Sequence, residues 1–349
     1  MSHINSFDVN ASRKEYYVCI SVAASLVKDQ RDAPIAYLLG NILIYFCIAI
    51  PLLFHVESHV AGLVHFLAVF IFFYERFVLA LHYLTHRPVF SNSLLNFLPE
   101  FLLGPAFGIP FGLYSTHHLV VHHVEGNIAP GDLSSTEYYQ RDNPAHFLLY
   151  WARFLLFSLI ELPVYALRRG RYDLFLRIAC SCVAIVYLYT FLLHRYFAFA
   201  LWVLMVPTVV GSFFLMLGNW SQHIFINPNL PDTPYGITYD IINSPTNQRT
   251  FNDGYHIQHH LNSKRHWTQL PVSFQEHQDE MATHDCIVFS GLSFVEVGLC
   301  VFLRRYDKLA AHFVDIRNRN LKPCQIEEIL RARLRPVHRW NDGCALKQA

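Results

Sequence analysis

The sequence predicts an all-α, multi-pass membrane protein with about four transmembrane helices and a helical cap on the cytoplasmic side. Three observations point to this fold class. The 349-residue chain is 53% hydrophobic and 15% aromatic, and its mean hydropathy is positive, which favours a membrane protein over a soluble one. Several apolar stretches are long enough to cross a bilayer. Groups of histidines lie at or beyond the ends of those stretches.

Charge and cysteine content argue against several other classes. The formal net charge is +1, and no long basic run offers a face for nucleic acid. The eight cysteines are scattered, unlike a disulfide framework or a zinc ribbon, so we expect free thiols facing a reducing compartment. The first 26 residues lack a compact secretory signal, so the first apolar run is expected to be retained as a helix.

The first two crossings are expected at residues 35–54 and 60–81. Each run contains about 20 apolar residues, which matches the hydrocarbon thickness of a bilayer. The link between them carries no Lys or Arg, whereas four basic residues precede the first run: Arg13, Lys14, Lys28 and Arg31. This asymmetry assigns the N-terminal flank to the cytoplasm, and two crossings return the chain there at His82.

Three further apolar stretches follow at residues 147–167, 174–193 and 197–218. Three crossings would place His223 on the opposite side from the earlier histidines, so one stretch is expected to lie flat or to dip in and out. We expect this of the first stretch, because Arg153 and Glu161 interrupt it and a proline breaks its end. Basic residues then mark a cytoplasmic approach to the last hairpin: Arg168, Arg169, Arg171 and Arg177.

Two other apolar segments are not expected to span. Residues 94–114 contain three prolines and three glycines, which predicts a buried or re-entrant connection. Residues 287–303 are shorter and include Glu296, which favours an interfacial or packed cytoplasmic helix. A last helix is expected over residues 325–334. The organisation is therefore an N-terminal segment (1–34), a membrane and cap catalytic domain (35–303) and a charged C-terminal tail (304–349).

Nine histidines form four short groups with helical spacing. The groups are His82 and His86; His118, His122 and His123; His223; and His256, His259 and His260. Residues three or four apart lie on one face of a helix, so members of a group can approach one ion. The adjacent rings of the second group point in different directions and suit two ions.

These groups together indicate a metal site. A single histidine is more often a satisfied core or surface residue than a ligand, but four groups on one expected side change those odds. Imidazole suits zinc, copper, iron and nickel alike, so ligand type does not name the metal. Nine rings exceed one tetrahedral zinc site and suggest two ions with four or five ligands each.

The segments HYLTH, HLVVHH and HIQHH resemble the three histidine boxes of the membrane fatty acid desaturase and hydroxylase superfamily. The similarity spans about residues 82–260, and its box spacings leave the subfamily open. By this resemblance the boxes hold a non-haem di-iron centre that activates dioxygen, and all nine histidines become iron ligands. Asn219 matches an asparagine associated with a metal-bound water in stearoyl-type desaturases. His117 could replace His118 as a ligand.

The resemblance implies oxidation of an unactivated C–H bond on a fatty acyl chain by dioxygen. Introduction of a double bond is expected first; lipid hydroxylation or oxidative decarboxylation to a terminal alkene are the alternatives. Two electrons would come from a separate donor of the cytochrome b5 or ferredoxin type, because the chain lacks the His-Pro-Gly-Gly signature of a fused cytochrome b5 domain. The active site would be cytoplasmic, at the endoplasmic reticulum membrane in a eukaryote. A non-catalytic membrane protein that binds zinc or copper is the rival class.

Carboxylates are expected around the histidines. An all-nitrogen shell supplies no negative charge to offset two iron cations, so acidic side chains should hydrogen-bond the rings' other nitrogens. The candidates are Glu75, Glu125 and Asp253. Two of them have alternative roles, since Glu75 could pair with Arg76 and Asp253 could cap the helix that carries the third box.

Overall fold

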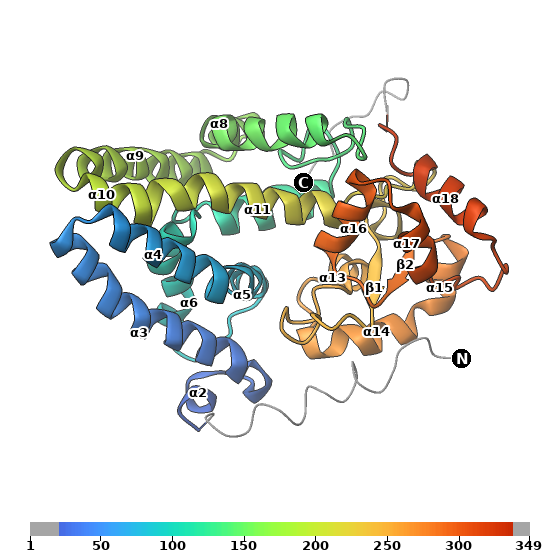
Figure 1. Cartoon of the computed structure of the whole chain (residues 1–349), viewed down its shortest axis with the longest axis horizontal. Helices are drawn as coiled ribbons and strands as arrows, with labels where there is room; N and C mark the ends of the chain where they lie inside the picture. The colour runs from blue at the N-terminus through green and yellow to red at the C-terminus, as the bar shows by residue number, and fades with distance from the viewer. Residues whose placement is uncertain (1–20, 338–349) are drawn as a thin grey trace. The chain divides into compact units, whose positions relative to one another are not determined.

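The computed structural model describes residues 21–337, and the expectations for residues 1–20 and 338–349, Arg13 and Lys14 among them, lie outside this range. The described chain is mostly helical, as predicted, with one small sheet (Figure 1). It divides into two compact units, each discontinuous in sequence. Within the described residues, unit 1 contains 121–154 and 216–337, and unit 2 contains 21–120 and 155–215.

The named elements of unit 2 are all helices, and one isolated antiparallel bridge joins Val27 to Phe90. These elements are α2 (Ser21–Leu26), η2 (Gln30–Asp32), α3 (Ala33–Val56), α4 (His59–Val69), η3 (Phe70–Tyr74), α5 (Glu75–His86), α6 (Ser93–Leu98), η4 (Pro99–Leu103), η5 (Gly104–Phe107), α9 (Tyr172–Arg195), α10 (Phe197–Ala200) and η7 (Leu201–Met205). Three helices begin in one unit and end in the other: η6 (Thr116–His122), α8 (Pro144–Arg168) and α11 (Val206–Gln222).

Unit 1 combines short helices with the sheet. Its elements are α7 (His123–Glu125), α12 (Pro234–Ile237), β1 (Asp240–Ile242), α13 (His256–Leu261), η8 (Trp267–Gln269), α14 (Leu270–Glu276), α15 (Gln278–Thr283), β2 (Val288–Ser290), α16 (Phe294–Phe302), α17 (Tyr306–His312) and α18 (Pro323–Ala332). The last of these confirms the helix expected near the C-terminus. Residues 304–337, expected to be a charged tail, belong to this unit.

Five helical stretches are long and apolar enough to cross a membrane: Gln30–Val56, His59–His86, Pro144–Arg168, Tyr172–Arg195 and Phe197–Gln222. The four expected crossings each lie within one of them. The fifth, Pro144–Arg168, contains the stretch expected to lie flat and has the lowest mean hydropathy of the set, 1.6. Length and composition therefore allow a fifth crossing, and the count of four stays a prediction.

The proline-rich and glycine-rich connection is interrupted, as predicted. Its helical turns end at Gly108, whose φ of +80° is left-handed. A Cβ atom at this position would overlap the carbonyl oxygen of Pro207, so both the backbone conformation and the close approach require glycine.

The expectation of one helix over residues 287–303 is wrong for its first part. Strand β2 pairs in parallel with β1, in the register Asp240↔Val288 and Ile242↔Ser290. Helix α16 begins only at Phe294, where Ser293 and Glu296 form a reciprocal capping box. A short, fully buried apolar run is compatible with either strand or helix, and the partner strand that decides between them lies far away in sequence.

Candidate metal centre

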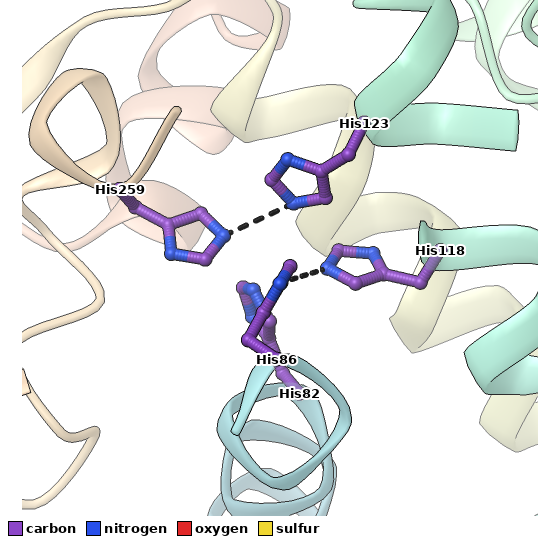
Figure 2. A group of neighbouring side chains, drawn as sticks. All are labelled: His82, His86, His118, His123 and His259. Carbon is purple, nitrogen blue, oxygen red and sulfur yellow. Dashed lines mark hydrogen bonds between the residues drawn. The ribbon is translucent and has the colours of Figure 1, made fainter. Parts of the chain in front are cut away.

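Unit 2 brings together the first histidine box and one ring of the second. His82 and His86 lie one turn apart on α5, and η6 supplies His118. Their candidate ligand nitrogens lie within 4.8 Å of one another. Figure 2 shows the closest contact, 2.8 Å between Nε2 of His86 and Nε2 of His118. The third ring beside His82 and His86 is that of His118 and not that of His117.

Unit 1 gathers five of the remaining six histidines in two arrangements. His123 and His259 face each other with 3.2 Å between their Nε2 atoms, as Figure 2 also shows. A separate trio consists of His122, His223 and His260, whose candidate ligand nitrogens also lie within 4.8 Å of one another. The candidate ligand nitrogens of His122 and His123 thus belong to different groups, as the angular separation of adjacent residues predicts.

The distances in the His86–His118 and His123–His259 pairs fit metal ligation. Two imidazole nitrogens bound at right angles to one ion, each about 2.1 Å from it, would be about 3.0 Å apart. The 2.8 Å and 3.2 Å contacts lie on either side of this value. In the trio, the Nε2 atoms of His223 and His260 are buried and make no hydrogen bond within the described residues. Burying a polar atom without a hydrogen bond costs free energy unless an ion binds it.

Hydrogen bonds orient two rings of the trio. Nδ1 of His122 donates to Oδ2 of Asp132 at 2.8 Å, and Nδ1 of His223 donates to the carbonyl oxygen of Ile237 at 3.0 Å. Each bond places the ring proton on Nδ1 and leaves the Nε2 lone pair for an ion. Burial, followed by the charge of His122, lowers the pKa of His223 to about 3, so this ring is neutral near pH 7.

Asp132 is the buried carboxylate that sequence reasoning missed. Its Oδ1 accepts from the backbone N–H and the hydroxyl of Ser134, both at 2.8 Å. Its Oδ2 also accepts from the N–H of Asn127 at 3.2 Å. Asp132 lies ten residues after His122, beyond the short helix α7, and no periodic pattern links the two. The loop that follows α7 is therefore folded around this carboxylate, which holds His122 in place.

Asp253 does not cap α13, contrary to the alternative expected for it. The cap residue of this helix is Tyr255, which makes no capping side-chain bond. Oδ2 of Asp253 instead accepts from Gln222 at 2.9 Å, and its Oδ1 lies 3.9 Å from Nδ1 of His256. Glu75 lies in the first turn of α5, and Glu125 is buried at the end of α7.

The carboxylate at the start of α13 is Asp240, which comes from strand β1. Its Oδ1 accepts from the N–H of Ile257 at 2.7 Å, and its Oδ2 accepts from Gln258 at 3.1 Å. Asp240 is fully buried, and burial raises its pKa to about 7 although these hydrogen bonds favour the charged form. It thus supplies the missing cap and fixes the helix that carries the third histidine box.

Two expected site residues lie beside the trio. The buried ring of His256 has its centroid 4.8 Å from that of His260 and 5.3 Å from that of His223. The side-chain amide of Asn219 donates to the hydroxyl of Tyr150 at 2.7 Å and to the carbonyl of Ser134 at 3.1 Å. Asn219 is therefore connected to the loop that holds Asp132.

Apolar helices of spanning length and groups of histidines that could hold metal ions are together features of a metal-binding membrane protein. The family model described as fatty acid desaturase matches residues 34–291. This is well over half of the chain, so the chain belongs to the fatty acid desaturase family. The family contains oxidoreductases of the desaturase and hydroxylase type, which act on fatty acyl lipids in membranes. No curated protein and no solved structure matches the chain.

Proposed function

We propose that this protein is a membrane-bound, oxygen-dependent di-iron oxidase that introduces a double bond into a fatty acyl chain. The observation that carries the proposal is the set of imidazoles with Nε2 atoms presented to an ion, two of them oriented by hydrogen bonds at Nδ1. Family membership supports both the acyl substrate and the pair of irons.

The proposal assigns all nine histidines as ligands. These are His82, His86, His118, His122, His123, His223, His256, His259 and His260, shared between two irons. Asn219 would act through a water molecule. Imidazole nitrogen is a ligand that iron accepts, and the hydrogen bonds at Nδ1 of His122 and His223 leave the Nε2 atom of each ring for the ion.

When bound, the irons would supply dioxygen activation and the oxidising power that an unactivated C–H bond requires. In a desaturation, one dioxygen takes two hydrogens from adjacent carbons, two electrons from a donor and two protons, and leaves as two waters. The protein would fix the acyl carbon beside the site and exclude water, since positioning selects the carbon that reacts. The electrons would come from a separate cytochrome b5 or ferredoxin.

We also propose four crossings, with the active site on the cytoplasmic side, which in a eukaryote would be that of the endoplasmic reticulum. Contacts at the two ends of α8 support a position along the membrane surface. Near its start, Tyr150 donates to the carbonyl of Ser134 at 3.1 Å. Near its end, Tyr165 donates to the carbonyl of Val120 at 3.3 Å. Both acceptors belong to the segment that includes the second histidine box.

The product distinguishes desaturation from its alternatives. The protein would be expressed with an electron donor and acyl substrates of several lengths, and the products identified by mass spectrometry. An unsaturated acyl product supports the proposal. A hydroxylated chain would instead identify a lipid hydroxylase, and a terminal alkene an oxidative decarboxylase.

A histidine substitution tests the role of the metal site. His259→Ala should abolish product formation and lower bound iron while the protein still inserts into membranes. His55→Ala is the matched control, because this histidine is exposed at the end of α3, outside the clusters. Retained turnover in His259→Ala would contradict its assignment as a ligand. About one zinc and no iron per chain in anaerobically purified protein would favour a non-catalytic metal-binding protein.

A further inference from the structure

Helix α16 packs one face against the end of a candidate membrane-spanning helix. Gly298 approaches the last turn of α11 so closely that a Cβ atom would overlap the hydroxyl of Ser221. Farther along α16, the ring of Phe302 lies 6.5 Å from that of Trp220 in α11 and 5.8 Å from that of Phe147 in α8. Because α11 is part of a candidate span, α16 is fixed at the depth where that span ends.

The adjoining face of α16 is apolar and exposed. Val295, Leu299 and Leu303 are 42%, 46% and 71% exposed and lie one turn apart along a single stripe. Between residues 216 and 337, only one other large aliphatic or aromatic side chain is exposed to this degree, Val272 on α14. A stripe concentrated on one helix marks a contact surface, whereas scattered apolar residues do not.

Exposed apolar residues also lie on α8, near its contact with α16. Leu148 and Leu149 directly follow Phe147, whose ring contacts that of Phe302, and are 50% and 61% exposed. The side chain of Arg304, directly after Leu303, is also exposed. An apolar stripe followed by an arginine is the pattern of a helix lying in a lipid–water interface.

We propose that α16 docks on the membrane in which the spanning helices lie. Val295, Leu299 and Leu303 contact the acyl region of the lipids, and Arg304 reaches the phosphate groups. Two observations favour lipid over a partner protein. Exposed leucines lie on α8 next to its contact with α16, and α16 packs on the terminal turn of α11, which is part of a candidate span. This contact would hold unit 1 at the lipid surface and is independent of the reaction catalysed.

Spin labelling in lipid nanodiscs tests the docking. A nitroxide is attached to Leu299→Cys in a chain whose other cysteines are serine, except the buried Cys286 and Cys300. A second protein has the same serine background but retains Cys324 and lacks Leu299→Cys. Cys324 is exposed on α18 of the same unit and serves as the aqueous control. The accessibility of each label to dissolved oxygen and to a water-soluble nickel chelate is measured by power-saturation electron paramagnetic resonance.

The label at position 299 should be several-fold more accessible to oxygen than to the nickel chelate, and the label at Cys324 should show the reverse. A label at Val295→Cys should repeat the result for position 299 and covers the case in which the first variant fails to fold. Equal accessibility at positions 299 and 324 would overturn the proposal. Protection from both reagents would also overturn it, because it would show that protein covers the stripe.

Discussion

Asp132→Asn is the substitution whose effect follows most directly from the site geometry. Oδ2 of Asp132 accepts from Nδ1 of His122 at 2.8 Å, and its Oδ1 accepts twice from Ser134. An asparagine amide can satisfy only one of these requirements. If its NH₂ group faces His122, the ring must move its proton to Nε2 and lose the ligand lone pair. If it faces Ser134, two donors oppose each other in a buried loop.

The cost can be estimated from the bond that is lost. A hydrogen bond to a charged group contributes about 1.5–3 kcal/mol, and loss of a partner that orients a metal-bound histidine typically weakens metal affinity about 10–100-fold. These figures agree, since tenfold corresponds to about 1.4 kcal/mol. We therefore expect Asp132→Asn to weaken binding of ferrous iron by one to two orders of magnitude.

The assay is an anaerobic competition titration of metal-free protein with ferrous iron and a chromogenic chelator. Asp279→Asn is the control, because this carboxylate is exposed on α15 and makes no bond to a histidine in the described structure. A thermal unfolding midpoint measured without metal separates lost affinity from lost folding. An affinity within about twofold of the unsubstituted protein would refute the role assigned to Asp132.

Three further outcomes are expected. Asp240→Ala should lower the free energy of unfolding by about 0.5–2 kcal/mol, because α13 loses its cap. The unfolding temperature of the unsubstituted protein should fall as pH rises from about 5 to about 8, since the folded pKa of Asp240, about 7, exceeds the unfolded value of about 3.9. Asp240→Asn should flatten this dependence of the unfolding temperature on pH. Gly298→Ala should lower the free energy of unfolding, measured by thermal unfolding, by about 1–3 kcal/mol. Adding Ser221→Ala should restore most of this stability, because the atom that overlaps the new Cβ is the serine hydroxyl. A double variant as unstable as Gly298→Ala alone would contradict this packing. Treatment with a ferrous chelator should abolish turnover, which iron and not zinc should restore; full activity without iron would count against the proposal.

Local patterns predicted the long helices and the histidine groups well. A run of about 20 apolar residues has few alternatives to a spanning helix, so residues 35–54 lie within Ala33–Val56 as expected. Spacings of three and four likewise predicted the helix over His256–Leu261. Both features depend on neighbours within a few turns of the same chain segment.

The groups that orient the rings depend on chain folding and left no local signal. Asp132 reaches His122 through a loop, the carbonyl of Ile237 reaches His223 from fourteen residues away, and Asp240 caps α13 from a strand. The nearer Asp253 was the natural candidate for that cap and is not the residue that performs it. The strand at residues 288–290 was missed for the same reason, since its partner is β1.

The metal content of active protein tests the central claim most directly. The protein would be purified anaerobically in a form that still oxidises an acyl substrate, and its metals counted by mass spectrometry alongside Mössbauer spectroscopy of iron-57-labelled material. The account predicts two irons per chain, lost together in His259→Ala. Active protein that contains no iron, or that carries a single zinc instead, would contradict it.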